Sequence, residues 1–391
     1  MAEAPELMAL HPLRGHEAAR ASLAHAYQRG VLPAALLFHG PRGIGKQRLA
    51  LWLAQLTVCE RPTMEPCGAC APCRMAASLE HPDVHWFFPL PRPKSATGDR
   101  LVDALEQARL EEIAAIREQP LHASHTDEVR GLYVGTVRSI RAKAYMRPVM
   151  AKGPVFIVGE AEALVPQEAS PEAANALLKL LEEPPGATRF ILTTSEAGLL
   201  PPTIPSRTVP LHLAPLPTEE VDAFLRAQAG LDAKAATRAA TLSQGSIGRA
   251  LGFVPGDEDE GPLEGLRRRA FEIVAAAASA RASEAHAVAL RFPPAGARTL
   301  AELFTFVEEW LRDLAAVASG MRHAAWHQDT LSALDRLVAQ RSLTSYQIAD
   351  AFSRVERARE LAIANVNPQL VVGTLIRELR ASLSVAAEVT T

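Results

Sequence analysis

Short apolar runs alternate with helical patterns over the first half of the chain. The runs are rich in β-branched and aromatic residues, which predicts buried strands at Ala35–Phe38, Val84–Phe88, Val155–Val158 and Arg189–Thr194. Apolar residues at helical spacing predict helices at His16–Arg29, from Gln47 to about Thr57, at Leu101–Glu118, at Val137–Met150 and at Pro171–Glu183. Strands that alternate with helices predict an α/β domain with a parallel sheet.

After Pro217 the strand pattern stops. Residues 218–253 read as a small helical unit, and residues 255–261 form an acidic linker bounded by glycine. Residues 263–386 are rich in Ala and Leu at helical spacing. We therefore expect three domains, an α/β domain at 1–213, a helical lid at 214–255 and an all-helical domain at 263–391.

Composition narrows the class of protein. A chain of 391 residues is long enough for two or three domains, and its formal net charge of −3 argues against coating nucleic acid by bulk charge. No apolar run reaches about 18 residues, and the first twelve residues lack the pattern of a signal peptide. We expect a cytoplasmic protein without a membrane partner.

The first candidate site is a glycine loop after the first predicted strand. Gly40, Gly43, Gly45 and Lys46 lie between that strand and the next helix, which is the arrangement of a phosphate-binding loop. Glycines let backbone N–H groups converge on phosphate oxygens, the helix N-terminus adds its dipole, and the lysine adds a charge.

Two positions near this loop depart from the pattern of an active nucleotide triphosphatase. The residue after Lys46 should be Ser or Thr, whose hydroxyl holds Mg²⁺, but it is Gln47. The strand Val155–Val158 should be followed by an Asp linked to the metal, but Gly159 follows it and Glu160 comes next. Both side chains expected at one ion are therefore missing together.

All four cysteines lie within one short segment. Cys59, Cys67, Cys70 and Cys73 have the spacing C-x7-C-x2-C-x2-C, which suits a four-thiolate Zn²⁺ site of the structural kind. An iron–sulfur cluster also uses four thiolates. The remaining alternatives are disulfides, which are disfavoured in a reducing compartment, and unrelated buried thiols, which chance would scatter along the chain.

A series of motifs resembles one family. The loop Gly40–Lys46, the cysteine module at 59–73, the acids after Gly159, the helix Asn175–Glu183 with Pro184-Pro185, and Ile204-Pro-Ser-Arg207 follow one another in order. This series is similar to the AAA+ subunits of the bacterial sliding-clamp loader, part of the DNA polymerase III holoenzyme. The likeness covers residues 1 to about 255, and it implies an AAA+ domain, a lid and a helical collar that supports oligomerisation.

The resemblance implies a division of labour between subunits. The family contains an active motor, gamma/tau, and a delta-prime subunit whose nucleotide site is idle. In active members the position of Gly248 carries a sensor arginine, whereas Arg249 here comes one residue later, turned by about 100° on a helix. Arg207 matches the family's arginine finger, which reaches the neighbouring subunit's nucleotide site, although Thr208 replaces the usual Cys. The combination resembles delta-prime, with Arg207 acting in trans.

Further roles are implied by the same resemblance. Thr194, or its neighbour Thr193, fits a sensor position that has become vestigial, and the loop would bind ATP or ADP weakly or without hydrolysis. The implied partners are the gamma/tau and delta subunits, the sliding clamp and primer–template DNA, for which the basic segment Val137–Arg147 is a candidate contact. Nothing in the chain resembles a polymerase active site, so the term DNA-directed DNA polymerase, a nucleotidyltransferase activity, would apply through membership of the holoenzyme.

Two alternatives stay open. One is a gamma/tau-like ATPase in which Gln47 and either Glu160 or Glu162 still manage Mg²⁺. The other is an AAA+ adaptor in a different pathway, which the fold permits because fold does not fix function. The sequence assigns no function to the segment 89–131.

Overall fold

The computed structural model describes residues 10–93, 99–121, 130–164, 172–255, 260–279, 281–292, 296–341, 343–363 and 366–384. The chain divides into two compact units. The first comprises residues 1–124 and 129–251, and the second comprises the remainder.

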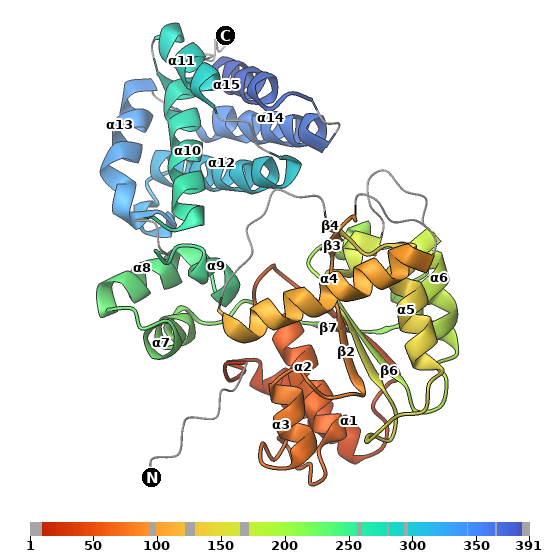
Figure 1. Ribbon diagram of the computed structural model, residues 1–391. Helices are drawn as coiled ribbons and strands as arrows, with labels where there is room; N and C mark the ends of the chain where they lie inside the picture. Colours follow the sequence, from red (N-terminus) through yellow and green to blue (C-terminus); the bar gives the residue numbers. More distant parts are fainter. Residues whose placement is uncertain are drawn as a thin grey trace. The chain divides into compact units, whose positions relative to one another are not determined.

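A five-stranded parallel sheet forms the centre of the first unit (Figure 1). The strand order is β2-β5-β6-β1-β7. The strands are β1 (Ala35–His39), β2 (Val84–Phe87), β5 (Val155–Val158), β6 (Arg189–Thr194) and β7 (Val209–His212). His39 pairs with Thr194, and Val158 pairs with Leu192. Because parallel strands end at the same edge, the segments that follow β1, β5 and β6 meet there.

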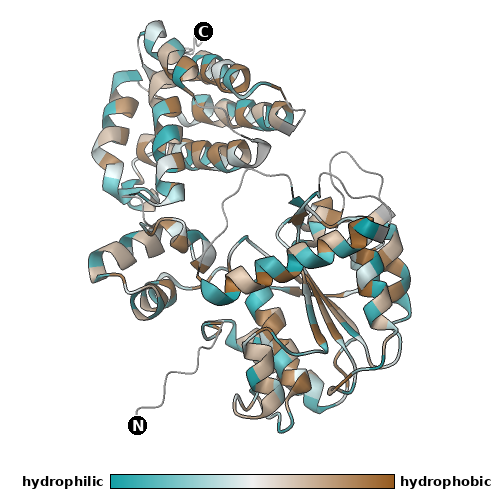
Figure 2. Cartoon of the chain, in the orientation of Figure 1, coloured by the Kyte–Doolittle hydropathy of each residue, from teal (hydrophilic) through white to brown (hydrophobic). Residues whose placement is uncertain are grey.

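Helices cover both faces of this sheet. Helices α1 (Glu17–Gln28) and α2 (Lys46–Val58) pack on the face that carries Leu36 and Phe38. Helices α5 (Val134–Ala144) and α6 (Glu172–Glu182) pack on the opposite face, where the rings of Phe156 and Phe190 stack with centroids 5.2 Å apart. Figure 2 shows the strands between them as hydrophobic, as expected for a parallel sheet buried on both sides.

The first unit contains further short elements. They are α3 (Ala71–Ala77), β3 (Leu90–Pro91), α4 (Asp99–Glu118), β4 (Arg130–Gly131), η1 (Ala161–Leu164), η2 (Ala197–Leu199), η3 (Pro205–Arg207), α7 (Thr218–Gln228), α8 (Ala233–Ser243) and α9 (Ile247–Leu251). Strands β3 and β4 form a separate antiparallel pair.

An ion cluster fastens α4 to the rest of the first unit. Glu106 on α4 accepts from Arg109 at 2.6 Å and from Lys143 of α5 at 3.2 Å. Arg109 also donates to the backbone oxygen of Trp86. Burial alone would raise the pKa of Glu106, but Arg109 and Lys143 lower it to about 2. The segment between β3 and α5 is therefore joined to the domain by charged contacts as well as apolar ones.

The described part of the second unit is helical. Its elements are α10 (Pro262–Ala278), α11 (Ala282–Arg291), α12 (Ala297–Ala318), η4 (Arg322–Ala324), η5 (Gln328–Thr330), α13 (Leu331–Arg341), α14 (Ser345–Ile363) and α15 (Pro368–Ser384). Trp310 of α12 is buried and stacks on His327, whose Nδ1 lies 2.8 Å from Asp313 Oδ2. A buried polar pair of this kind is stabilised by its mutual hydrogen bond.

The predicted fold class is confirmed, since a parallel sheet domain precedes a largely helical region. The prediction of a helix at 137–150 is wrong at both ends, because α5 begins at Val134 and ends at Ala144. Pro148 cannot continue a helix, and the backbone N–H groups of Val149, Met150 and Ala151 instead bind the carboxylate of Asp83, each at 2.7 Å.

Several elements were not predicted from the sequence. Strand β7 contains Pro210, which masked its strand pattern but is tolerated at the edge of a sheet. Helix α3 and the pair β3–β4 were also missed. The predicted helix start at Pro171 lies outside the described residues. The division into three domains stays a prediction. No helix in the described part of the chain is long and apolar enough to cross a membrane.

Candidate functional site

The glycine loop has the backbone conformation that only glycine adopts easily. Gly40, Gly43 and Gly45 have φ values of 144°, 75° and 101°. A Cβ added to Gly40 would also lie 2.2 Å from the backbone oxygen of Leu213. The loop shape therefore depends on glycine at these positions.

The loop lysine is satisfied within the chain. Lys46 Nζ donates to the backbone oxygens of Gly40 at 2.8 Å and Pro41 at 2.7 Å, and to Ser195 Oγ at 2.9 Å. Lys46 is only 7% exposed, and this burial lowers its pKa to about 8. The carboxyls of Glu162 and Glu160 partly oppose that shift. Ser195, which follows β6, is a site residue that sequence reasoning missed.

The backbone oxygens of the loop are bound, whereas several of its N–H groups are open. His16 Nε2 lies 2.7 Å from the oxygen of Ile44, Ser246 Oγ donates to the oxygen of Arg42, and Gly248 N donates to the oxygen of Gly43. None of the described residues accepts a hydrogen bond from the N–H of Gly43, Ile44 or Gly45. A loop with bound oxygens and open N–H groups has the polarity that an anion requires.

Gln47 and Gly159 form one structural unit. A Cβ added to Gly159 would lie 2.6 Å from Gln47 Oε1, 2.8 Å from Cδ and 2.9 Å from Nε2. Gln47 Oε1 accepts a hydrogen bond from the indole Nε1 of Trp86 at 2.8 Å, so the amide is held over Gly159. The two departures from the expected metal ligands are therefore complementary, because the longer side chain occupies the space that a side chain at 159 would need.

A similar close approach occurs at Gly248. A Cβ added to Gly248 would lie 2.9 Å from Gly43 Cα, and a Cβ added to Gly43 would lie 2.5 Å from Ser246 Oγ. The start of α9 thus rests directly on the loop. A side chain at 248 does not fit in this arrangement.

The acids after β5 also take part in local hydrogen bonds. Glu160 has a positive φ of 50°, and its N–H donates to Thr193 Oγ1 at 3.2 Å. Burial raises the pKa of the Glu160 carboxyl. Glu162 Oε1 accepts from the N–H of Ser195 at 3.0 Å. The hydroxyl of Thr194 instead accepts from the N–H of Glu196, so Thr193 is the threonine that contacts this corner.

Arg207 lies on η3 and is held by groups of its own domain. Its guanidinium binds the carboxylate of Glu182, at the end of α6, and donates at 3.1 Å to the backbone oxygen of Thr203 and to Ser206 Oγ. The Arg207 side chain remains 32% exposed. The arginine is therefore fixed in place and still open to solvent.

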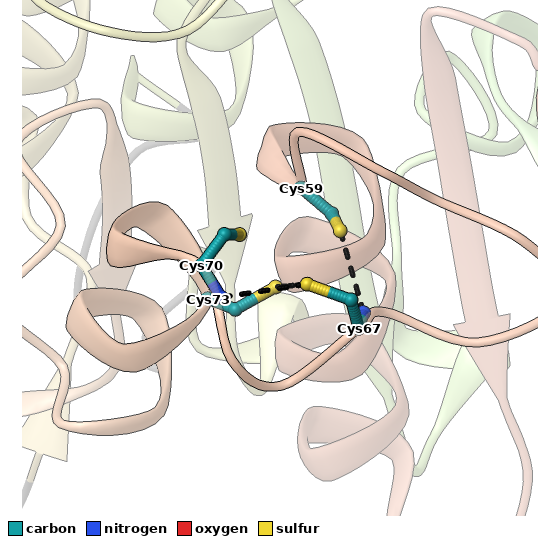
Figure 3. Close-up of side chains that lie close together, drawn as sticks. All are labelled: Cys59, Cys67, Cys70 and Cys73. Atoms are coloured by element: carbon teal, nitrogen blue, oxygen red, sulfur yellow. Dashed lines mark hydrogen bonds between the residues drawn. The ribbon is translucent and has the colours of Figure 1, made fainter.

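The four cysteines gather at the far end of α2 (Figure 3). Cys59 follows α2, Cys67 lies in the next loop, and Cys70 and Cys73 lie at the start of α3. Their sulfur atoms all lie within 4.8 Å of one another. In a tetrahedral site with Zn–S bonds of about 2.3 Å the sulfurs are about 3.8 Å apart, so this arrangement fits a four-coordinate metal with a small adjustment.

The surroundings of the sulfurs favour the thiolate form at Cys67 and the neutral thiol at Cys59 and Cys73. Backbone N–H groups of Cys70 and Ala69 lower the pKa of the Cys67 thiol to about 6. Burial raises the pKa of Cys59 and of Cys73. A bound cation would stabilise the thiolate form at all four positions.

The cysteine module is tied to α2 by side chains. Gln55 Nε2 donates to the backbone oxygen of Cys73 at 2.9 Å, and Trp52 Nε1 donates to Glu65 at 2.6 Å. Arg20 of α1 also pairs with Glu65. The module is thereby anchored to two helices of the first unit.

Comparisons with known proteins decide the family. The family model for DNA polymerase III, delta subunit, matches residues 15–217, just over half of the chain. The chain belongs to this clamp-loader family. The relatives of this chain include both delta' and gamma/tau subunits. Membership of the family therefore does not say which kind of subunit this chain is.

Two curated relatives illustrate this. The DNA polymerase III subunit delta' of Pseudomonas aeruginosa is 34% identical over 200 residues, 51% of this chain and 45% of that protein. Subunit gamma/tau of Mycobacterium tuberculosis is 33% identical over 204 residues, 51% of this chain and 28% of that protein. The chain thus matches less than half of the length of either relative. A solved gamma subunit-related protein of Thermotoga maritima is 14% identical, with a TM-score of 0.41 over 92% of this chain and 99% of that one.

Proposed function

We propose that this chain is a delta-prime-like subunit of the sliding-clamp loader, which does not hydrolyse ATP at its own site and supplies Arg207 to the ATP site of a neighbouring subunit. The observation that carries the first half is the position of the Gln47 amide over Gly159. The expected hydroxyl and carboxylate ligands of Mg²⁺ are both missing, and the space between their positions is filled. Without that ion the charge that develops during phosphoryl transfer is poorly stabilised.

The second half rests on Arg207. Its contacts with Glu182, Thr203 and Ser206 hold the guanidinium at an exposed turn. An arginine held in this way loses little conformational freedom when it meets a phosphate group of a partner, and a finger of this kind can be worth factors of about 10³–10⁵ in rate. In the assembled loader, replacing Arg207 should therefore slow ATP hydrolysis.

The cysteine module is proposed to bind structural zinc. Four thiolates at these positions would fill a tetrahedral coordination sphere, so no coordination position would remain for a substrate. Zinc would fix the end of α2 and the start of α3 to each other, which is a role in stability and not in catalysis.

The proposed partners are the gamma/tau and delta subunits, the sliding clamp and primer–template DNA. Arg138 and Arg141 on α5 are exposed and are candidates for contacts with phosphates, which would position DNA without reading its sequence. Lys143 is a weaker candidate because it pairs with Glu106.

The alternative is a gamma/tau-like ATPase, which the similarity to gamma/tau relatives keeps open. The test is the Mg²⁺-dependent ATPase activity of the purified chain. We expect no hydrolysis above the background of a mock purification. Hydrolysis that disappears in Lys46→Ala would contradict the delta-prime-like proposal and favour the motor.

A further inference from the structure

The loop corner does not fit the Mg²⁺ that its motif implies. Gln47 offers a metal one oxygen, Oε1, as a Ser or Thr hydroxyl would, but that atom already accepts the indole N–H of Trp86. Of the neighbouring oxygens, Thr193 Oγ1 accepts from Glu160 N and Glu162 Oε1 accepts from Ser195 N, while Glu162 Oε2 is buried without a partner among the described residues. Mg²⁺ demands near-octahedral geometry and takes one or two protein ligands beside waters and phosphates, and the oxygen that Gln47 offers is held by Trp86 in the space above Gly159.

The orientation of the Gln47 amide follows from its partner. An indole N–H can only donate, so the atom that faces Trp86 is the amide oxygen. Nε2 is consequently directed elsewhere and carries two N–H donors. None of the described residues accepts a hydrogen bond from Gln47 Nε2.

These donors belong to a larger set. The N–H groups of Gly43, Ile44 and Gly45 are open, and Lys46 Nζ lies at the base of the same loop. Gln47 occupies the second position of α2, a helix of 13 residues whose N-terminus adds a partial positive charge. The corner therefore combines several donors and a cation, close to the carboxyls of Glu160 and Glu162, with an amide where the motif predicts a metal ligand.

We propose that the phosphate loop of this chain binds a nucleoside di- or triphosphate without a divalent cation, with the side-chain amide of Gln47 donating to a phosphate oxygen in place of the metal. Trp86 is a positioning residue, because it fixes which end of the amide faces the ligand. The inference concerns the chain's own loop and does not depend on Arg207.

The test is calorimetric titration of the full chain with ADP, in EDTA and again with excess Mg²⁺. We expect binding in EDTA, and an affinity that Mg²⁺ leaves unchanged within about twofold or lowers, because the cation sequesters free ADP. Binding that Mg²⁺ strengthens by more than about twofold would overturn the proposal. Absence of ADP binding in EDTA would overturn it too.

Three variants separate the role of Gln47 from folding. Gln47→Glu keeps the size and the oxygen that faces Trp86 but replaces the donors with a negative charge, so affinity in EDTA should fall by about tenfold to a hundredfold. Gln119→Glu places the same charge on an exposed side chain of the first unit and should leave affinity unchanged. Unaltered affinity of Gln47→Glu in EDTA would contradict the role of the amide.

A third variant should reverse the metal dependence. Gln47→Thr combined with Gly159→Asp removes the obstructing amide and restores both ligand types, so Mg²⁺ should strengthen ADP binding by about tenfold or more. Thermal melting by circular dichroism confirms that each variant is folded. The proposed function has its own readout, the loader ATPase of Arg207 variants, so failure of one idea is distinguishable from failure of the other.

Discussion

The two ends of α2 differ in the side chains that they would offer a metal ion. At the C-terminal end, Cys59 begins a set of four thiols whose sulfurs lie within 4.8 Å of one another. At the N-terminal end, Gln47 places an uncharged amide over Gly159 and is held there by Trp86. One end gathers four thiols that a cation would stabilise as thiolates, and the other end places an uncharged amide where the motif predicts a metal ligand.

The difference shows how the position of an expected metal ligand can be filled by another side chain. Removing a ligand usually leaves a cavity or an unsatisfied polar group, and both are costly. Here Gln47 fills the space and its oxygen is hydrogen-bonded, so the altered corner is packed. A candidate metal site and an expected metal position without its ligands can therefore be told apart by whether the side chains converge on a common point or occupy it.

The largest effect is expected at the cysteine end. Cys73→Ser should abolish stoichiometric zinc and lower the free energy of unfolding of the first unit by on the order of 5 kcal/mol, because metal binding stabilises only the folded module. Zinc content by mass spectrometry and chemical denaturation check this. Zinc content equal to that of the unaltered chain would exclude the four-thiolate site.

At the other end of α2 the effect is electrostatic and depends on pH. The pKa of Lys46 is lowered to about 8 in the folded state from a usual value of 10.5, so between these values the unfolded chain binds more protons. Stability should therefore rise with pH from about 8 to 10.5, by up to about 3 kcal/mol. Lys46→Met lacks the titrating group and serves as the reference.

The measurement is the difference in unfolding free energy between the unaltered chain and Lys46→Met across that pH range. A difference that stays constant with pH would show that the lysine is solvated and not buried as described.

The complementarity of Gln47 and Gly159 predicts a coupling of intermediate size. Gly159→Ala should cost about 1–2 kcal/mol, because its Cβ displaces the amide from Trp86. In the background of Gln47→Ala the same change should cost close to nothing. A double-mutant cycle from denaturant unfolding measures the coupling. If the free-energy costs of the two changes are additive, Gln47 and Gly159 are not coupled and the prediction is wrong.

The smallest effect concerns the tie between α2 and the cysteine module. Gln55→Ala removes the hydrogen bond to the oxygen of Cys73 and should lower stability by about 1 kcal/mol while zinc content is retained. Denaturant unfolding together with metal analysis reads both quantities. Loss of zinc in this variant would mean that the tie, rather than the thiols alone, holds the metal site.

Much of the fold could be predicted because its signals are local. The alternation of short apolar runs with helical periodicity indicated the parallel sheet, and a glycine loop between a strand and a helix indicated the phosphate corner. Strand β7 was not predicted because Pro210 interrupts its strand pattern. Helix α3 was not predicted because it is a single short helix that begins between two cysteines.

The site could be predicted only as far as its motifs are contiguous. The absence of two metal ligands was evident at Gln47 and Gly159, but the contact between them was not, since nothing in a single sequence pairs residues so far apart. Trp86 and Ser195 were missed for the same reason, although the carboxyl end of β6 next to β1 was a position to search. Glu182 lies at the end of α6, within a motif that the sequence showed, but its pairing with Arg207 depends on tertiary packing.

The proposed function assigns Arg207 to the ATP site of a neighbouring subunit and assigns no hydrolysis to the chain's own site. The most direct measurement is single-turnover ATP hydrolysis by the loader, reconstituted with this subunit as Arg207→Ala and stimulated by clamp and primed DNA. Arg226→Ala is the matched control, because Arg226 is also exposed and also paired with an acid, Asp222. We predict that Arg207→Ala slows hydrolysis severalfold or more while the ring still assembles, and that the control does not. An unchanged rate with Arg207→Ala would show that Arg207 does not act at a neighbouring ATP site.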